Sequence, residues 1–152
     1  YKSAKFIAGK RPWEQAVDVA LPCAIQNELN LDEAKELLKN GCKVVTEGSN
    51  MSSTYEAVEF FMANQNKIMF SPGKASNAGG VATSGLEMSQ NSMRLRWSAK
   101  EVDENLHGIM VSIHQACVDA AAKFGTPGNY VNGANIAGFL RVADSMIDQG
   151  LV

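Results

Sequence analysis

"VDVALPCAIQNELNLDEAKELLKNGCKVVTEG", residues 17–48, is the stretch that decides the fold. Residues 17–22 form a short, mostly apolar run closed by a proline, which is typical of a buried strand. Residues 30–41 predict a helix with Asn30 as its N-cap, acidic residues in its first turn and Gly41 placed to end it. Residues 42–48 predict a second strand. A strand, a helix and a second strand joined by short loops are typical of a right-handed βαβ unit in a parallel sheet.

The chain repeats this pattern once and then changes. Residues 52–65 predict a second helix, capped by Ser52 or Ser53, and residues 67–73 predict a third strand. Beyond residue 76 we expect only helices, over residues 77–97, 98–124 and 132–150, the second opening with a capping box of Ser98 and Glu101. The sequence therefore predicts an α/β fold: a parallel sheet first, and long helices after it.

Composition narrows the class of protein. The 152 residues are 45% hydrophobic and 20% charged, as in an ordinary soluble globular domain. Fourteen basic residues against 16 acidic ones give a net charge of −2, so neither nucleic acid nor an anionic membrane is an expected partner. No apolar run is long enough to span a membrane, and the first residues do not resemble a signal peptide.

Cysteine and histidine give no sign of a disulfide framework or a metal site. Cys23, Cys42 and Cys117 are odd in number and far apart, so we expect reduced, buried thiols in a cytoplasmic protein. His107 and His114 share one expected helix but are too far apart to bind a single metal ion. We expect both to be partly buried helix residues.

Unusual residues follow each of the three expected strands. The three segments are "PCAIQNE" (22–28), "EGSNMSST" (47–54) and "SPGKASNAGG" (71–80). Ligands of parallel sheets bind beyond the carboxyl ends of the strands, so these segments should meet at one crevice. Glycine and alanine at a helix start let a flat ligand reach backbone N–H groups, and the helix dipole favours a negative group there. Asn77 could cap that helix or pair with an amide of a ligand.

Three familiar motifs do not fit. "SPGKAS" has alanine after Lys74 and no glycine five residues before Gly73, so it is not the phosphate loop G-x-x-x-x-G-K-[ST]. "ATSGLE" is not the G-x-S-x-G nucleophile elbow. The chain also has no G-x-G-x-x-G turn to clamp the pyrophosphate of a dinucleotide.

Taken together, "LPCAIQNEL", "EGSNMSSTYEA", "SPGKASNAGGVATSGLEMSQNS" and "GANIAGFLRVADSMIDQG" closely resemble the hexameric glutamate dehydrogenases of bacteria and fungi. The resemblance covers the chain from about Pro12 onward. It implies that the chain is the C-terminal third of such an enzyme. Residues 1–76 would be the second half of a Rossmann-like NAD(P)-binding domain, a parallel sheet with helices on both faces. Residues 77–152 would be a helical segment that packs back toward a substrate domain.

The resemblance also implies an activity and a coenzyme site. The complete enzyme would deaminate L-glutamate to 2-oxoglutarate and ammonia, passing a hydride to NADP or NAD. Cys23 and Ala24 would line the adenosine and ribose side of the coenzyme. Asn50 would reach the nicotinamide ribose, and Asn77 would bind the carboxamide.

Two further residues would bind substrate: Ser84 would donate a hydrogen bond to the side-chain carboxylate of glutamate, and Val81 would pack nearby. Two positions depart from the family pattern. Ile25 stands where threonine is common, which removes a hydroxyl from the coenzyme pocket. Ser52 stands where proline is usual, which should loosen that turn.

The catalytic lysine and aspartate of the family would lie in a part preceding this chain, so we expect no catalytic residue here and no activity from the isolated 152 residues. Two alternatives stay open. One is a sister dehydrogenase of leucine, valine or phenylalanine, although a hydroxyl at Ser84 favours an acidic substrate. The other is a non-catalytic binding or assembly module.

Overall fold

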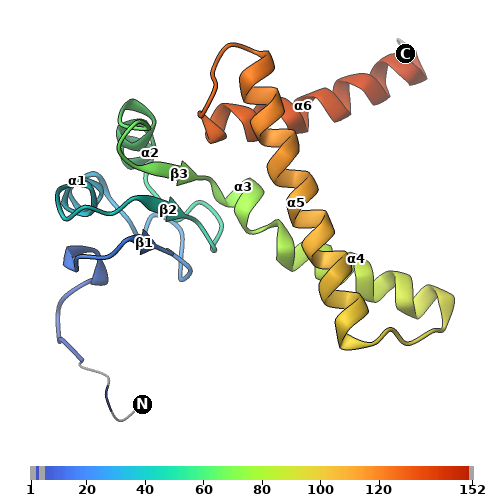
Figure 1. Cartoon of the computed structure of the whole chain (residues 1–152), viewed down its shortest axis with the longest axis horizontal. Helices are drawn as coiled ribbons and strands as arrows, with labels where there is room; N and C mark the ends of the chain where they lie inside the picture. Colours follow the sequence, from blue (N-terminus) through green and yellow to red (C-terminus); the bar gives the residue numbers. More distant parts are fainter. Residues whose placement is uncertain (1–2, 4–5, 151–152) are drawn as a thin grey trace.

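A computed structural model of the chain describes residue 3 and residues 6–150. Its sheet has three parallel strands in the order β1 (Val19–Ala20), β2 (Val44–Thr46) and β3 (Met69–Ser71). Val45 lies opposite Ala20 in β1 and Phe70 in β3. The strands are shorter than the sequence predicts, but their number, order and direction confirm the α/β fold (Figure 1).

Two helices connect the strands, and local capping explains where each begins. In α1 (Leu31–Lys39), Asn30 accepts from the backbone of Asp32 and Glu33, and the Glu33 side chain accepts from the Asn30 backbone, so the predicted cap is confirmed. Gly41 has a φ of +84°, the left-handed conformation that suits glycine after a helix end.

The predicted cap of the next helix, α2 (Tyr55–Ala63), is wrong. Thr54 is the N-cap, and its hydroxyl accepts from Ala57 N at 3.4 Å. Ser52 and Ser53 cannot serve because both are buried within the preceding segment. The Ser53 backbone N–H donates instead to the carboxylate of Glu47.

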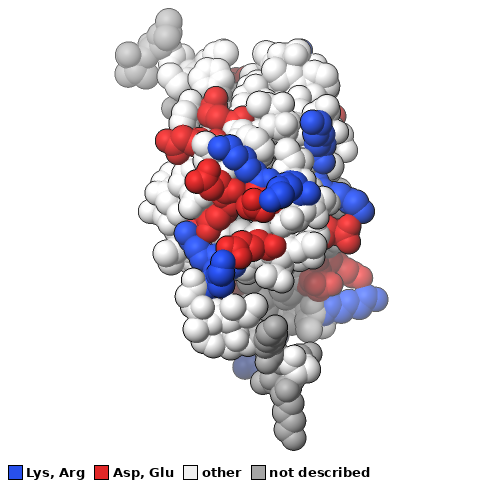
Figure 2. Space-filling view, turned by 90° about the vertical axis from the view of Figure 1, so that its left-hand side faces the viewer, with Lys and Arg blue, Asp and Glu red and all other residues white. Residues whose placement is uncertain are grey.

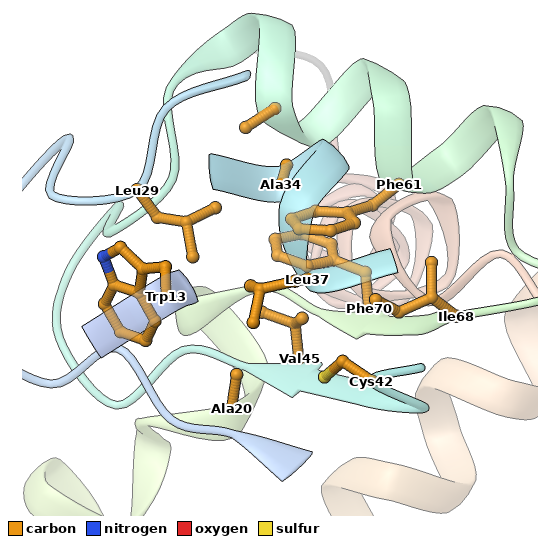
Figure 3. Packing of buried hydrophobic residues seen from close by; sticks show 11 residues of the cluster. Trp13, Ala20, Leu29, Ala34, Leu37, Cys42, Val45, Phe61, Ile68 and Phe70 are labelled. Carbon is orange, nitrogen blue, oxygen red and sulfur yellow. The ribbon is translucent and has the colours of Figure 1, made fainter. Parts of the chain in front are cut away.

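Both connecting helices pack on one face of the sheet. The core between these helices and the sheet contains Leu37 of α1, Phe61 of α2, Val45 of β2 and Phe70 of β3 (Figure 3). The rings of Phe61 and Phe70 stack with centroids 5.1 Å apart. The 3-10 helix η1 (Pro12–Glu14) closes one side of this core with Trp13.

The opposite face of the sheet differs from the expectation of helices on both faces. Val19 and Met69, which point away from the core, are 49% and 64% exposed. The reason is topological: consecutive right-handed crossovers between neighbouring strands place α1 and α2 on the same side. Within the described residues no helix covers the second face at these two positions.

Helices make up the rest of the chain and extend away from the sheet (Figure 1). A short α3 (Gly73–Ser76) leads into α4 (Ala78–Met93), then α5 (Ala99–Lys123) and α6 (Tyr130–Gln149). The helix predicted to reach residue 97 stops earlier because Arg94 adopts a left-handed conformation with a φ of 56°. The Ser98–Glu101 capping box of α5 is confirmed.

Close backbone contact joins α5 to α6. At Gly133 of α6, a Cβ atom would collide with the carbonyl oxygen of Cys117 in α5. Beside this crossing, the rings of His114 and Tyr130 stack with centroids 5.6 Å apart. Burial raises the pKa of the Tyr130 hydroxyl to about 12.

The predictions for cysteine and histidine are partly confirmed. All three cysteines are free, and Cys42 and Cys117 are buried, which raises the pKa of each thiol. Cys23, however, is exposed. His107 and His114 both lie on α5 as expected, but both are exposed rather than partly buried.

Surface charges alternate in sign. Figure 2 shows acidic and basic side chains intermixed on the side of the molecule near α1, with no continuous patch of either sign. Ion pairs there include Lys10–Glu14 and Arg11–Glu33, at 2.9 and 3.1 Å. None of the helices described is both long enough and apolar enough to cross a bilayer.

Candidate functional site

The segments that follow the three strands meet at one edge of the sheet, as the sequence predicts. The first two are joined through Pro22, whose carbonyl oxygen accepts from Gly48 N at 2.8 Å and from Ser49 N at 3.2 Å. A Cβ atom at Gly48 would meet the sulfur of Cys23, so a larger residue there would require that exposed side chain to turn away. The end of β1 therefore packs directly on the end of β2.

Glu47 joins the second segment to the third. Its side chain is buried, Oε1 accepts from Ser53 N at 2.7 Å, and Oε2 accepts from Gly73 N at 2.7 Å. Its backbone oxygen accepts from the Ser76 hydroxyl at 2.6 Å. Sequence reasoning did not single out Glu47, although a charged residue directly after a buried strand was a signal that could have identified it.

Ser52, for which a loosened turn was the prediction, binds the same segments together through its hydroxyl group. Its side chain is fully buried, and its hydroxyl donates to Pro22 O at 3.2 Å or to Ser49 O at 3.3 Å. The hydroxyls of Ser49 and Ser52 also contact each other. Buried hydrogen bonds of a serine hydroxyl therefore join this turn to the end of β1.

Asn50 and Asn77 face each other across the second and third segments. Asn77 Nδ2 donates to Asn50 Oδ1 at 2.5 Å, although the two residues are 27 positions apart. Asn77 makes no side-chain cap to α4, so of its two predicted uses the capping one is excluded. Asn77 Oδ1 and Asn50 Nδ2 make no hydrogen bond within the described part of the chain, which leaves an acceptor oxygen and a donor NH₂ group for a ligand.

A depression of about 600 Å³ lies beside this pair. Its lining residues come from the first two segments: Ala24, Ile25, Gln26, Gly48, Ser49 and Asn50. The backbone N–H of Ala24 donates to Glu28 Oε1 at 2.7 Å. All four residues predicted to bind coenzyme, Cys23, Ala24, Asn50 and Asn77, lie at the same edge of the sheet.

The two residues predicted to bind substrate lie further along α4. Val81 is 74% exposed, and the Ser84 hydroxyl lies 3.4 Å from Gly80 O of the preceding turn. They follow Asn77 by about one and two helical turns, and neither lines the depression. Both are exposed.

A second cavity, which is mostly apolar, lies elsewhere, between α3, α5 and α6. Its volume is about 490 Å³, and its lining includes Ala75, Ile113, Ala137 and Leu140. Lys74 borders it and donates to Asn135 Oδ1 at 2.6 Å. We place the functional site at the strand ends instead, because polar backbone and amide groups converge there.

The chemistry available at the strand ends is that of binding rather than of proton transfer. Both carboxylate oxygens of Glu47 already accept backbone hydrogen bonds, and the ammonium group of Lys74 is engaged by Asn135. Residues 3 and 6–150 contain no cluster of three metal-binding side chains.

Comparisons with known proteins identify the family. The model of the glutamate/leucine/phenylalanine/valine dehydrogenases matches residues 1–150. The chain is 56% identical over 147 residues to the NADP-specific glutamate dehydrogenase of Escherichia coli. The aligned region covers 97% of this chain and 32% of that enzyme. It is also 56% identical over 156 aligned positions to the NAD-specific glutamate dehydrogenase of Bacteroides fragilis. That alignment covers 100% of this chain and 34% of the relative.

Solved structures agree with these matches. The crystal structure of Plasmodium falciparum glutamate dehydrogenase aligns with a TM-score of 0.93 at 48% identity, over 100% of this chain and 32% of that one. The chain thus spans about a third of the length of the curated relatives it matches. Since the family model matches nearly every residue and the relatives are more than half identical, this chain belongs to the glutamate/leucine/phenylalanine/valine dehydrogenase family.

Proposed function

We propose that this chain forms part of the coenzyme and substrate sites of a glutamate dehydrogenase. The enzyme oxidatively deaminates L-glutamate to 2-oxoglutarate and ammonia and transfers a hydride to NAD or NADP. The observation that carries this proposal is the Asn50–Asn77 amide pair at the meeting point of three strand ends. Its remaining acceptor and donor match those of a carboxamide, the group that distinguishes the nicotinamide end of the coenzyme.

Within this site each residue has a proposed role. Cys23 and Ala24 line the adenosine and ribose side, next to the depression that Ala24 helps to form. Asn50 contacts the nicotinamide ribose, and Asn77 binds the carboxamide. On α4, Ser84 donates to the side-chain carboxylate of glutamate, with Val81 packed beside the substrate.

The chain does not determine whether the coenzyme is NAD or NADP. Its NADP-specific and NAD-specific relatives are equally similar to it, at 56% identity each. An enzyme of this fold distinguishes NAD from NADP by the side chain near the 2′-oxygen of the adenosine ribose. That side chain follows an earlier strand of the nucleotide-binding domain. We therefore propose NAD or NADP without a preference.

The domain division and assembly also belong to this proposal. Residues 1–76 form the second half of the NAD(P)-binding domain, and residues 77–152 pack toward a substrate domain. The whole enzyme is a cytoplasmic homo-oligomer, a hexamer, that contacts neither nucleic acid nor membrane. The free thiols of Cys23, Cys42 and Cys117 support a reducing compartment.

The proposed activity can be tested in an enzyme of the family's full length that carries these 152 residues. Glutamate-dependent reduction of NAD or NADP is expected, with little activity on leucine. Ser84→Ala should raise KM for glutamate about 10- to 100-fold, because a hydrogen bond to a charged group is lost. Ser89→Ala is the matched control, since Ser89 lies on the same helix and its hydroxyl bonds Gly85 O at 2.9 Å.

Other outcomes would favour the alternatives. Activity on leucine, valine or phenylalanine but not on glutamate would assign the chain to a sister dehydrogenase. Failure of the unaltered enzyme to bind either coenzyme would favour an assembly module. The isolated 152-residue chain is expected to be inactive. Glutamate-dependent reduction of NAD or NADP by this chain alone would contradict the proposal that the catalytic residues lie outside it.

A further inference from the structure

Glu47 is a buried carboxylate whose partners are all backbone groups. Only 4% of its surface is exposed, and each oxygen accepts a hydrogen bond of 2.7 Å from a backbone N–H. None of the ion pairs among the described residues includes it. Burying a carboxylate is costly unless such bonds compensate, so the two N–H groups are what hold this side chain in place.

The two N–H groups belong to the segments that carry the asparagine pair. Ser53 closes the turn that contains Asn50, and Gly73 opens the short helix that ends at Asn77. Gly73 is 26 residues from Glu47 in sequence, so no local structure fixes their separation. The carboxylate therefore acts as a bridge of fixed length between the two segments.

Packing around the bridge leaves little freedom. A Cβ atom on Gly73 would lie 2.6 Å from Ser49 O, 3.3 Å from Glu47 Oε2 and 3.5 Å from Asn77 Nδ2. The backbones of the two segments are thus in direct contact next to the amide pair. A change in the length or polarity of the bridge must move one segment relative to the other.

We propose that Glu47 is a positioning residue for the nicotinamide end of the coenzyme. By fixing the segments that carry Asn50 and Asn77, it holds the two amides at the separation that a carboxamide requires. Glu47 itself touches neither coenzyme nor substrate. This inference rests on the proposed function, since it assigns Glu47 to the same site.

Glu47→Gln tests the proposal because it preserves side-chain volume and replaces one acceptor with an NH₂ donor that faces a backbone N–H. In the full-length enzyme, the Kd for the reduced coenzyme should rise about tenfold or more. The Kd for ADP-ribose, which lacks the nicotinamide ring, should change less than about twofold. Glu56→Gln, at an exposed position in the first turn of α2, is the control and should change neither value.

A double-mutant test separates positioning from general stability. If Glu47 acts through the amide pair, Glu47→Gln should change coenzyme affinity less than about twofold in an Asn77→Ala background. An equal loss of coenzyme and ADP-ribose affinity, or an undiminished effect in that background, would overturn the proposal. Glu47→Asp, which is too short to reach both N–H groups, should show the same selective loss.

Failure of this inference is distinguishable from failure of the proposed function. If the unaltered enzyme binds coenzyme and oxidises glutamate but Glu47→Gln behaves like Glu56→Gln, only the role of Glu47 is refuted. If the unaltered enzyme does neither, the function itself is refuted, and this role with it. If neither Glu47 variant folds, Glu47 is needed for folding rather than for positioning, which also overturns the inference.

Discussion

Replacing Gly73 by alanine would measure how tightly the strand ends are packed. The added Cβ would lie 2.6 Å from the carbonyl oxygen of Ser49, whereas ordinary contact begins at 3.4 Å. The difference, 3.4 − 2.6 = 0.8 Å, is the distance by which one backbone segment must retreat. That retreat also strains the 2.7 Å hydrogen bond from Gly73 N to Glu47.

The energetic cost follows from this geometry. Overpacking a tight site costs about 1–3 kcal/mol, and a weakened hydrogen bond adds up to about 1 kcal/mol. Alanine recovers at most about 1 kcal/mol through its better helix propensity. The free energy of unfolding should therefore fall by about 1–3 kcal/mol, which lowers Tm by about 2–12 °C in a chain of this size.

Gly80→Ala is the matched control, because Gly80 lies within α4 and no atom would meet its Cβ within 4 Å. Relief of the glycine entropy cost should raise stability by about 0.5–1 kcal/mol. Thermal and urea unfolding, followed by circular dichroism and by the fluorescence of buried Trp13, measure both variants. If Gly73→Ala proves as stable as Gly80→Ala, the strand ends are not in the contact described, and the site geometry is refuted.

Three further predictions concern buried groups. A thiol reagent at neutral pH should modify Cys23 first, because Cys42 and Cys117 are buried and their pKa values are raised; mass spectrometry showing equal rates in the folded chain would contradict this. Since the pKa of Tyr130 is raised from 10.0 to about 12, its contribution to stability should be complete below pH 10 and should be lost as pH rises toward about 12. Tyr130→Phe should remove that part of the decline in urea unfolding at alkaline pH, and an unchanged decline would refute the assignment. Ser52→Ala should lower stability by about 1–2 kcal/mol, whereas the exposed Ser89→Ala should stay within about 0.5 kcal/mol; equal effects would show that the buried hydroxyl is not bonded as described.

Predictions from sequence succeeded where the cause is local. Helix capping acts within one helical turn, so it can be predicted from neighbouring residues. This was the case for Asn30, Gly41 and the Ser98–Glu101 pair. The order of strands and helices followed from hydrophobic pattern and short connections. The family resemblance likewise came from contiguous motifs, and the comparisons confirmed it.

Predictions failed where a distant contact overrides local preference. Ser52 and Ser53 have good capping side chains, but the parallel bridge between Leu29 and Ser53 buries that segment and leaves capping to Thr54. Cys23 was expected to be buried with the other thiols, yet its strand ends at an exposed edge.

By itself, then, the sequence determined the α/β class, the ends of α1, the start of α5 and the family, because these depend on residues that are near one another in the chain. Only the tertiary structure decided that Asn77 pairs with Asn50 rather than capping α4, and that Glu47 bridges two segments. The Glu47–Gly73 and Asn50–Asn77 contacts join residues 26 and 27 positions apart, and their distances are set by the packing of parallel strands rather than by any local preference.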